Sequence, residues 1–439
     1  MTSLILYHKL NLRQGKMPEK FIIKKSPPLK GEVKISGSKN AAGPILAATL
    51  LTDKTCQISN LPRISDILNL IEVIKEMGAE VKWQGKNTVS ICAKDINPEK
   101  IPADLFEKAR MSVLLVGPLL GRFSYFKIPH PGGDKIGVRP ITTHLEGLAG
   151  FGAKVKNTGQ FYCFERPKDL KGAKIVLKEF SVTATENVIM AAALAKGKTT
   201  IEIAAAEPHV KELADLLLKM GLKIKGQGAH TIEIEGSKRL LSGTKWTVPP
   251  DYIEAGTFLI AFAVTNGQGK IKNVRPGDLT FFLNKMKEIG VNFRVQGKNI
   301  VLAKSKNLKA AKVQVLPHPG FPTDLQPQTC LLLTKANGKS LIHDPLYENR
   351  FSHLYELRKM GADIEITDPH RALIFGKTKL LGTKVDGTDI RSTVTLILAG
   401  LIAKGKTVVS GAEQVDRGYE QIEEKLKLLG ARIERIAEN

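Results

Sequence analysis

The sequence predicts an α/β fold of two pseudo-symmetric domains, each built from three copies of one helix–strand–helix–strand unit. Three observations lead to this prediction. A short phrase recurs six times along the chain, a strongly apolar helix recurs with it, and 439 residues are too many for a single hydrophobic core. The copies are spaced by about 70 residues, so six units account for nearly the whole chain.

The repeated phrase is a glycine followed by an alternating apolar segment. Its copies are MGAEVKWQG from residue 77, FGAKVKNTG from 151, MGLKIKGQG from 220, IGVNFRVQG from 289, MGADIEITD from 360 and LGARIERIA from 429. Glycine commonly ends a helix because it adopts the left-handed conformation freely. Alternation of apolar and polar residues indicates a strand. Each copy therefore predicts the end of a surface helix and the start of a strand.

A second helix in each unit is apolar on nearly all sides, which predicts that it is buried. A glycine turn and a strand follow it, as in AKGKTTIEI and GQGKIKNV. We therefore expect three buried helices inside a shell of sheets and surface helices in each domain. The six segments are NAAGPILAATLL, RMSVLLVGPLL, ENVIMAAALA, EAGTFLIAFAV, LQPQTCLLLT and RSTVTLILAGLIA.

Composition excludes several classes of protein. No apolar run has the length of a membrane span, so we expect no membrane insertion. The first 16 residues hold no small-residue cleavage site, which argues against a signal peptide. The four cysteines are far apart in sequence, which indicates neither a zinc site nor a disulfide framework and favours a cytoplasmic location. They are Cys56, Cys92, Cys163 and Cys330.

The formal net charge of +23 raises the possibility of nucleic-acid binding. The lysines are spread along the chain, however, and the few tyrosines and tryptophans form no evident stacking platform. We therefore expect a dispersed lysine surface and no nucleic-acid partner.

The segment from Gly400 to Thr407 matches the phosphate-loop pattern G-x-x-x-x-G-K-T. That loop needs a strand before it and a helix after it, so that helix N-terminal amides face the phosphate. Here the predicted order is reversed, with the buried helix first and the strand second. We interpret the segment as the turn that ends a helix.

Unusual polar residues gather where the buried helices begin and where strands lead into surface helices. Five of them are cations at helix starts, where the helix dipole does not favour positive charge. An anionic ligand held by the side chains and the helix amides would explain them. Equivalent positions in repeated units should converge on the cleft between the two domains. The five cations are Lys39, Arg110, Arg139, Arg391 and Arg417.

The alternative is that each arginine pairs with a nearby carboxylate, as Asp389 could with Arg391 and Asp416 could with Arg417. Asp324 has a similar ambiguity. It follows the proline-rich approach PHPGFP to a helix start, where an aspartate is most often an N-cap. If it faces a cationic cleft instead, its pKa falls and it stays ionised, as a proton acceptor must.

Six segments together resemble the UDP-N-acetylglucosamine 1-carboxyvinyltransferases of the enolpyruvyl transferase family. They are GEVKISGSKNAAGPILAA, GGDKIGVRP, PHPGFPTDLQ, ENRFSH, GTDIRS and DRGYEQIEEKL, and the resemblance covers residues 20–436. It implies an inside-out α/β barrel fold in which an N-terminal strand joins the second domain. The expected boundaries are residues 38–248 for the first domain, 17–37 plus 249–439 for the second, and 1–16 for a disordered extension.

The resemblance implies transfer of the enolpyruvyl group of phosphoenolpyruvate to the 3-hydroxyl of UDP-N-acetylglucosamine, with release of phosphate. This addition–elimination reaction is the first committed step of peptidoglycan (cell wall) synthesis, and we expect it to use no cofactor and no metal. The expected catalytic residues are Asp134, Asp324 and Lys39. The expected substrate-binding residues are Lys39, Asn40, Arg110, Arg139, Pro140, Ile141, Thr142, Thr143, Ser181, Val182, Glu207, Asp324, Leu346, Arg391 and Arg417.

The resemblance also implies a role for each of these residues. Asp324 would accept the proton of the sugar hydroxyl, while Glu207 and the backbone at Leu346 would place the sugar. The phosphate would bind Lys39, Arg139 and Arg417, with Arg110 and Arg391 completing the anion pocket. Residues 139–143 would line the uridine, and Ser181 with Val182 the diphosphate.

The loop at residues 129–140 resembles the family's mobile lid, and position 134 departs from the usual pattern. A cysteine usually stands there and gives a proton to the methylene carbon, whereas this chain has Asp134. Aspartic acid can donate only while protonated, so burial or substrate charge must raise its pKa, which the neighbouring cations oppose. The antibiotic fosfomycin alkylates the lid cysteine, so we expect this chain to be insensitive to it. Other departures are Gly43, where leucine is usual, and Glu179, where the family sometimes has a cation near the expected diphosphate.

Three alternatives remain open at this stage. The sister enzyme that uses shikimate 3-phosphate shares the fold, although Asn40 and the lid sequence favour the nucleotide sugar. A basic nucleic-acid-binding repeat protein would bind DNA with a steep salt dependence. A regulatory paralogue would have lost activity. We expect a monomer or a weak homo-oligomer.

Overall fold

The first repeat shows how the sequence builds each unit of the fold. In the computed structural model, which describes residues 19–134, 136–237 and 239–437, the apolar helix α2 (Lys39–Ala48) is buried along most of its length. Ser38 caps this helix by accepting a hydrogen bond from the amide of Ala41. The short helix η1 (Thr49–Leu51) and strand β3 (Cys56–Ser59) follow, then the surface helix α3 (Ser65–Glu76). Strands β4 (Glu80–Trp83) and β5 (Val89–Cys92) complete the unit as an antiparallel hairpin.

That second hairpin strand corrects the predicted unit, which ended after one strand. A strand left alone would expose an unpaired edge, and the returning strand pairs with it on one side and with the strand after the buried helix on the other. The signal was present in segments such as VSIC and NIVL, which alternate after a short polar turn. The six predicted glycines all have positive φ where the surface helix ends: Gly78, Gly152, Gly221, Gly290, Gly361 and Gly430.

The remaining elements of the first half follow the same plan. The second unit is preceded by η2 (Pro98–Lys100) and α4 (Ala103–Phe106) and contains η3 (Arg110–Leu115), α5 (Val116–Arg122), β6 (Tyr125–Pro129), α6 (Thr142–Ala149), β7 (Lys154–Asn157) and β8 (Phe161–Glu165). The third contains β9 (Lys174–Val176), α7 (Val182–Ala192), β10 (Gly197–Glu202), α8 (Pro208–Lys219), β11 (Lys223–Lys225) and β12 (Thr231–Gly236), and is followed by β13 (Lys245–Thr247).

The second half repeats the plan three more times. The fourth unit contains α9 (Tyr252–Val264), β14 (Gln268–Lys272), η4 (Pro276–Leu279), α10 (Thr280–Ile289), β15 (Phe293–Gln296) and β16 (Asn299–Leu302). The fifth contains β17 (Lys312–Gln314), η5 (Thr323–Leu325), α11 (Gln326–Leu333), β18 (Gly338–His343), α12 (Ser352–Lys359), β19 (Asp363–Asp368) and β20 (Arg371–Gly376). The sixth contains β21 (Lys384–Asp386), α13 (Ile390–Ile402), β22 (Lys406–Ser410), α14 (Ala412–Val415), α15 (Ile422–Leu428) and β23 (Arg432–Ala437).

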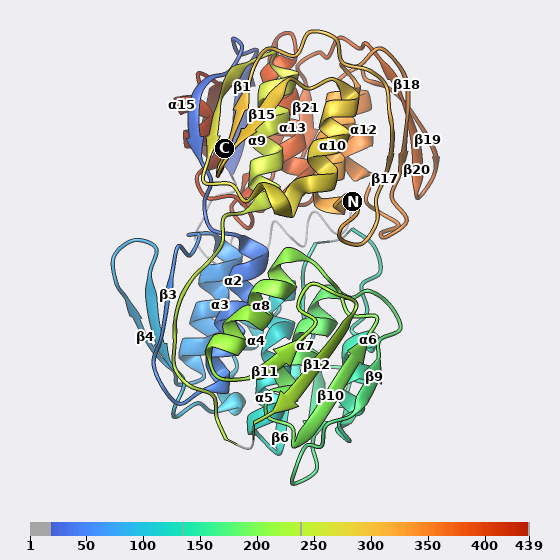
Figure 1. The fold of residues 1–439 in the computed structure, drawn as a ribbon. Coiled ribbons are helices and arrows are strands. Elements are labelled where there is room, and N and C mark those ends of the chain that lie inside the picture. The colour runs from blue at the N-terminus through green and yellow to red at the C-terminus, as the bar shows by residue number, and fades with distance from the viewer. Residues whose placement is uncertain (1–18, 135, 238, 438–439) are drawn as a thin grey trace.

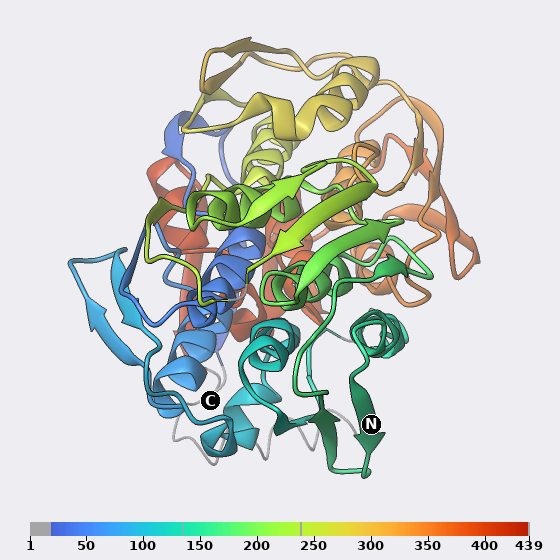
Figure 2. The ribbon, with the colours of Figure 1, turned by 60° about the horizontal axis from the view of Figure 1, so that its bottom comes forward.

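Each unit forms its own small sheet on the outside of the molecule, around the helices (Figure 2). Five of the sheets described have four strands, and the sheet of the second unit has three, in the order β6-β8-β7. The N-terminal strand β1 (Glu19–Lys24) lies between β22 and β23 and supplies the strand that the sixth unit lacks. Strand β2 (Lys30–Lys34) pairs in parallel with β14, so both N-terminal strands belong to sheets of the second half.

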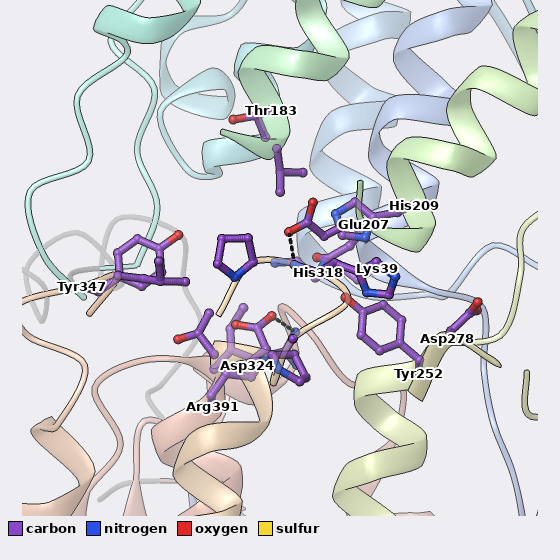
Figure 3. Close-up of a pocket in the computed structure, with 18 of the residues that line it drawn as sticks. Lys39, Thr183, Glu207, His209, Tyr252, Asp278, His318, Asp324, Tyr347 and Arg391 are labelled. Carbon is purple, nitrogen blue, oxygen red and sulfur yellow. Dashed lines mark hydrogen bonds and ion pairs between the residues drawn. The ribbon is translucent and has the colours of Figure 1, made fainter. Parts of the chain in front are cut away.

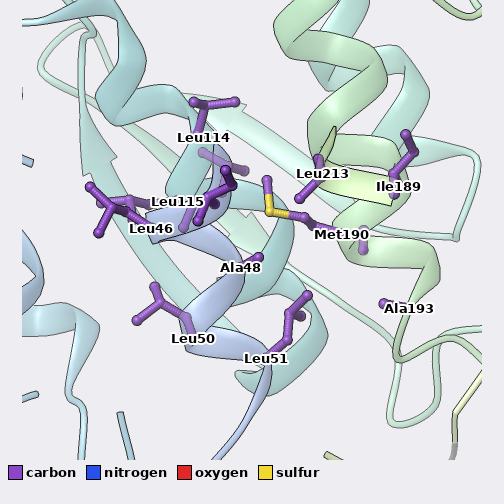
Figure 4. Packing of buried hydrophobic residues seen from close by; sticks show 14 of the residues in the cluster. Leu46, Ala48, Leu50, Leu51, Leu114, Leu115, Ile189, Met190, Ala193 and Leu213 are labelled. Carbon is purple, nitrogen blue, oxygen red and sulfur yellow. The ribbon is translucent and has the colours of Figure 1, made fainter. Parts of the chain in front are cut away.

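The chain folds into two halves (Figure 1). The buried apolar side chains form two separate clusters, one in each half. In the first, η3 packs against helices α2 and α7 through side chains such as Leu115, Leu46 and Met190 (Figure 4). Gly43 allows α2 to approach η3, because an added Cβ would come within 3.1 Å of Met111. The second cluster includes Phe21 and Ile23 of β1 together with residues from 252 onward. These clusters support the proposed domain boundaries at residues 38 and 249.

The chain passes twice between the halves, and the two passages pair with each other. Gly37 and Pro250 form an isolated bridge, and the amide of Ser38 donates to the carbonyl of Pro249 at 2.7 Å. The phosphate-loop pattern lies far from this crossing, where α13 ends at Ile402 and leads into β22, so the interpretation as a helix-ending turn is confirmed. Among the residues that the structure describes, no helix has both the length and the apolarity to cross a bilayer.

Candidate active site

A cavity of about 520 Å³ lies between the two halves, walled by helix starts and loops from both (Figure 3). All five cations that the sequence singled out line this cavity, together with Arg350, so their predicted convergence is confirmed. Asn40, Asp134, Val182, Glu207, Asp324 and Leu346 line it as well. The repeat geometry therefore concentrates positive charge around two carboxylates, Asp134 and Asp324.

Asp324 is held between two arginines of its own half. Arg350 Nη2 donates to its Oδ1 at 2.8 Å, and Arg391 Nη2 donates to its Oδ2 at 2.9 Å. Burial opposes ionisation, but the two guanidinium groups outweigh burial and hold the pKa of Asp324 far below its usual value. Helix η5 begins after Pro322 without a side-chain cap, so the N-cap alternative for Asp324 is wrong.

The two pairs that the sequence suggested, Asp389 with Arg391 and Asp416 with Arg417, do not form, although both arginines pair with other carboxylates. Asp389 caps α13 by accepting hydrogen bonds from the amides of Arg391 and Ser392, while the Arg391 guanidinium reaches Asp324. Asp416 binds Arg435 at 2.6 Å and leaves Arg417 free to point into the cavity. Asp389 is therefore engaged by helix amides, and Asp416 by an arginine of strand β23.

Arg417 joins the two halves through carboxylates of the first half. Its Nε donates to Asp66 Oδ1 at 3.0 Å, and its Nη1 forms an ion pair with Asp134. The other oxygen of Asp66 lies 3.1 Å from Lys39 Nζ. Asp66 therefore holds Lys39 of the first half next to Arg417 of the second half, across the gap between the halves.

The lid loop itself is bonded to the second half. The carbonyl of Ile136 accepts from the amide of Asn349 at 3.0 Å, and the amide of Val138 donates to Glu348 Oε2 at 3.2 Å. These bonds bring Asp134 against Arg417. Lys135, which also belongs to the predicted lid, lies outside the described residues.

The structure decides the balance at Asp134 that the sequence left open. Burial favours the neutral acid, but four cations outweigh burial and lower the pKa of Asp134 below its usual value. The side chain is therefore ionised at neutral pH in this arrangement, contrary to the raised pKa that a resting proton donor requires. The four cations are Arg417, Lys39, Arg139 and Arg350.

Arg110 and Arg139 form a second cationic pair on the first half. Arg110 Nη2 donates to the carbonyl of Pro140 at 3.1 Å, and burial with the charge of Arg139 lowers the pKa of Arg110 to about 10. The guanidinium of Arg139 lies 5.7 Å from the ring centroid of Tyr347. Among the residues that the structure describes, neither guanidinium forms an ion pair with a carboxylate, and two such cations favour an anionic ligand.

Five predicted binding residues do not line the cavity directly. Ile141 and Thr143 are buried at the start of α6, where Thr143 Oγ1 donates to Glu179 Oε1 at 2.9 Å. Glu179 thus places a negative charge where the resemblance expected a cation. The other three are close in sequence to the lining residues Arg139 and Val182 but do not themselves line the cavity: Pro140, Thr142 and Ser181.

Two carboxyl groups form the wall opposite Asp324. Glu207, at the start of α8, accepts a long hydrogen bond of 3.5 Å from the amide of His318. Glu186, on α7, is fully buried, and among the described residues neither Glu186 Oε1 nor Glu207 Oε2 has a hydrogen-bond partner. Burial, reinforced by the charge of Glu207, raises the pKa of Glu186 well above its usual value. Leu346 lines the same cavity, but its amide donates to Asp344 Oδ1 at 3.1 Å.

Asp66, Arg350 and Glu186 are not among the site residues predicted from the sequence, although Arg350 and Glu186 lie in polar segments near helix starts, residues 348–350 and 181–187. Asp66 looked like an ordinary acidic residue in the first turn of a surface helix, and Glu186 lies inside an apolar helix. Arg350 belonged to the ENRFSH segment, and its buried position beside the proline-rich approach could be inferred only from the repeat. Among the described residues, no group of three or more His, Cys, Asp or Glu side chains is placed to hold a metal.

Comparison with known proteins identifies relatives that match nearly the whole chain. Residues 23–426 match the EPSP synthase (3-phosphoshikimate 1-carboxyvinyltransferase) family. UDP-N-acetylglucosamine 1-carboxyvinyltransferase 1 of Caldanaerobacter subterraneus is 45% identical over 95% of this chain and 100% of its own length. The UDP-N-acetylglucosamine 1-carboxyvinyltransferase of Magnetococcus marinus is 45% identical over 95% of this chain and 99% of its own.

Solved structures show the same fold at lower sequence identity. The enolpyruvyl transferase NikO from Streptomyces tendae superposes with a TM-score of 0.87 at 23% identity, covering 97% of this chain and 100% of that one. EPSP synthase from Acinetobacter baumannii gives a TM-score of 0.73 at 20% identity, covering 95% and 100%. The predicted enolpyruvyl transferase fold is therefore confirmed, and the chain belongs to the UDP-N-acetylglucosamine 1-carboxyvinyltransferases, transferase enzymes of the EPSP synthase family.

Proposed function

We propose that this chain transfers the enolpyruvyl group of phosphoenolpyruvate to the 3-hydroxyl of UDP-N-acetylglucosamine and releases phosphate, in the first committed step of peptidoglycan synthesis. The observation that carries this proposal is the cavity between the halves, where six cations surround two ionised carboxylates. Both proposed substrates are anions, and a cavity of this size and charge suits them. A cytoplasmic location and a monomeric or weakly oligomeric state stay predictions.

The phosphate of phosphoenolpyruvate is assigned to the cations at the gap between the halves. Asp66 holds Lys39 and Arg417 side by side. Arg139 acts on Asp134, the carboxylate that also faces Lys39 and Arg417. Arg110, whose charge is only partly compensated, suits a second anionic group. Asn40 lies next to Lys39 at the start of α2 and lines the cavity.

In the addition step, the sugar hydroxyl attacks C2 of phosphoenolpyruvate while C3 receives a proton. Asp324 is ionised but is a weak base, because two arginines stabilise its charge. It therefore accepts the hydroxyl proton as the C–O bond forms, when that proton becomes more acidic. Asp134, in its neutral form, gives the proton to C3.

In the elimination step, the methyl group at C3 loses a proton and C2 loses phosphate, which restores the C2=C3 double bond. The Asp134 carboxylate that formed in the addition step is placed to take this proton back. Asp324 then releases to solvent the proton that it accepted and is ionised again. The leaving phosphate stays among the cations that bound it, so its developing charge is stabilised where it forms.

The acceptor is assigned to the first-half wall and the rim behind it. Residues 139–143 are proposed to line the uridine, Ser181 and Val182 the diphosphate, and Glu207 with the backbone at Leu346 the sugar. Arg110 and Arg139 support a diphosphate there, whereas Glu179 opposes one. This chain would then bind the diphosphate through arginines and amides in place of the missing cation.

We also propose that the enzyme is insensitive to fosfomycin. Opening the epoxide requires a strongly nucleophilic thiolate, and a carboxylate in an ion pair with an arginine is a far weaker nucleophile. The four cysteines are free, and none lines the cavity in the part of the chain that the structure describes.

Phosphate release tests the proposed function. The chain is mixed with phosphoenolpyruvate and either UDP-N-acetylglucosamine or shikimate 3-phosphate, and free phosphate is measured over time. We expect phosphate release when UDP-N-acetylglucosamine is the acceptor and none when shikimate 3-phosphate is the acceptor. Release with shikimate 3-phosphate alone would assign the chain to the sister reaction, and release with neither would identify an inactive paralogue.

A further inference from the structure

The lid carboxylate occupies the guanidinium edge that an incoming phosphate needs. Arg417 uses its Nε for Asp66 and its Nη1 for Asp134 and for Gln414 Oε1, the latter at 3.1 Å. We propose that Asp134 is an internal stand-in for the substrate phosphate, so that a phosphate group binding at Arg417 displaces the Asp134 carboxylate and this carboxylate then takes up a proton. The inference rests on the proposed function, which places the phosphate at Arg417.

The two carboxylates on Arg417 differ in how firmly they are held. Asp66 lies in the first turn of α3, its side chain is 4% exposed, and it also binds Lys39. Asp134 lies on the loop between β6 and α6, and its side chain is 16% exposed. Asp66 is therefore the fixed partner that orients Arg417, and Asp134 is the partner that an external anion can replace.

The charges around Asp134 explain why displacement brings protonation. Burial is the largest single influence on this carboxyl group and favours its neutral form. The ionised form prevails only because cations face it from the second half, from α2 and from the lid loop itself: Arg417 and Arg350, Lys39, and Arg139. A phosphate dianion among these cations would offset about two of their charges, and Asp66 already offsets part of the rest. Burial then decides, and Asp134 takes a proton from solvent.

This sequence of events loads the proton donor only when the substrate is present. The proton that Asp134 takes from solvent on phosphate binding is the one it gives to C3 when the acceptor hydroxyl attacks C2. The elimination step returns a proton from C3 to the carboxylate, and departure of phosphate lets Asp134 ionise and pair with Arg417 again. A thiol is a weaker acid, with an ordinary pKa of about 8.5, so a cysteine at this position would depend less on such loading than the aspartate does.

Sulfate provides a probe that needs neither acceptor nor turnover, because it is a tetrahedral dianion that does not titrate near neutral pH. Binding of sulfate to the full chain is measured by calorimetry in buffers of different ionisation enthalpy, which yields both the affinity and the number of protons exchanged. The wild-type chain is compared with Asp134→Asn and with the control Asp386→Asn. Asp386 accepts a hydrogen bond from Ser410 at 2.6 Å outside the cavity.

We expect Asp134→Asn to bind sulfate roughly 10-fold to 100-fold more tightly than wild type, because Arg417 loses its competing charged partner. Wild type and Asp386→Asn should take up about one proton per sulfate at pH 7, and Asp134→Asn none. Asp134→Ala, which removes the carboxylate differently, should behave like Asp134→Asn. Thermal unfolding confirms that each variant is folded.

Unchanged or weaker sulfate binding by both Asp134 variants would overturn the proposal, as would equal proton uptake by wild type and the variants. Failure of the proposed function has a different signature. In that case phosphoenolpyruvate and either acceptor release no phosphate, whatever the sulfate measurements show.

Discussion

Asp324 and Asp134 are two of the carboxylates that face the cavity, and both are held ionised by arginines, but these arginines are anchored differently. Asp324 binds Arg350 and Arg391, and all three residues belong to the second half. Asp134 belongs to the first half and binds Arg417 of the second. One ion-pair cluster is therefore built into a single core, whereas the other exists only while the halves and the lid are together. Pairing with arginine therefore gives Asp324 a permanent negative charge, whereas the charge of Asp134 depends on a partner that another anion can take.

The difference suits the two proposed tasks. A proton acceptor must stay ionised before the hydroxyl attacks, and the fixed arginines ensure this at Asp324. A proton donor must become neutral at the right moment, and only a carboxylate whose cation can be taken by another anion does so. Glu186 shows the third possibility: it is more deeply buried than either aspartate, no cation among the described residues pairs with it, and its pKa rises.

Removing the fixed charge should have the largest effect on turnover. Asp324→Asn cannot accept a proton, so we expect kcat to fall by roughly 10²–10⁴-fold. Binding of UDP-N-acetylglucosamine, measured by titration, should stay largely intact because the amide keeps the shape. Asp386→Asn serves as the control for a carboxylate outside the cavity. A kcat within a few-fold of wild type would show that Asp324 only organises the two arginines.

Reversing the charge of Arg417, the cation that pairs with Asp134, should weaken the binding of mainly one substrate. Arg417→Glu places a negative charge beside Asp66 and Asp134. We expect the KM for phosphoenolpyruvate to rise roughly 30-fold or more, with a much smaller change for the nucleotide sugar. Steady-state kinetics with each substrate varied in turn measures both constants.

The control for Arg417→Glu is Arg275→Glu, because Arg275 also links the halves, through Glu212, but does not line the cavity. If both variants raised the two Michaelis constants equally, Arg417 would serve closure of the halves and not the anion.

Replacing the exchangeable carboxylate with a thiol should alter pH dependence and drug sensitivity together. Asp134→Cys should retain activity and shift the alkaline limb of its pH profile upward, because a thiol stays protonated to higher pH than a carboxylic acid. Incubation with fosfomycin followed by intact-mass measurement should show an adduct on Asp134→Cys and none on wild type. An adduct on the wild-type chain would contradict the placement of Asp134 as the donor.

The smallest predicted effect concerns stability at Glu186. Because its folded-state pKa is raised, the stability from neutral Glu186 is complete below its ordinary pKa of about 4.3 and is lost as pH rises through the folded value. Glu186→Gln stays neutral, so its Tm should fall less steeply than that of wild type between about pH 5 and about pH 9, by a few degrees. The exposed control Glu165→Gln should follow wild type. Equal slopes for all three chains would show that Glu186 has no raised pKa.

The sequence predicted the features that depend on periodicity. The apolar helices, the six glycines and the convergence of five cations all follow from one repeated unit, and the structure contains each of them. The second hairpin strand was missed because its short alternating segments, such as VSIC, were grouped with the strand before them. Whether an aspartate caps a helix or faces a cavity depends on residues far away in the chain, which periodicity does not reveal.

The partners of the charged residues could not be predicted for the same reason. Arg417 was expected to have the choice of Asp416, one residue away, yet it binds Asp66 and Asp134 of the other half. The sign of the pKa shift at Asp134 depends on four cations contributed by several elements, so no local segment contains it. The resemblance to known enzymes implies a role for Asp134 but does not predict whether its side chain is ionised.

Infrared difference spectroscopy tests the contrast between the two carboxylates most directly. The protein is labelled with ¹³C at its aspartate carboxyl groups, so that the carboxyl group of the substrate is distinguishable, and spectra are recorded before and after phosphoenolpyruvate is added. We predict that one labelled carboxylate signal is replaced by one neutral carboxyl signal, which is absent in Asp134→Asn and present in Asp386→Asn. No new neutral carboxyl signal in wild type, or one that survives in Asp134→Asn, would contradict the account.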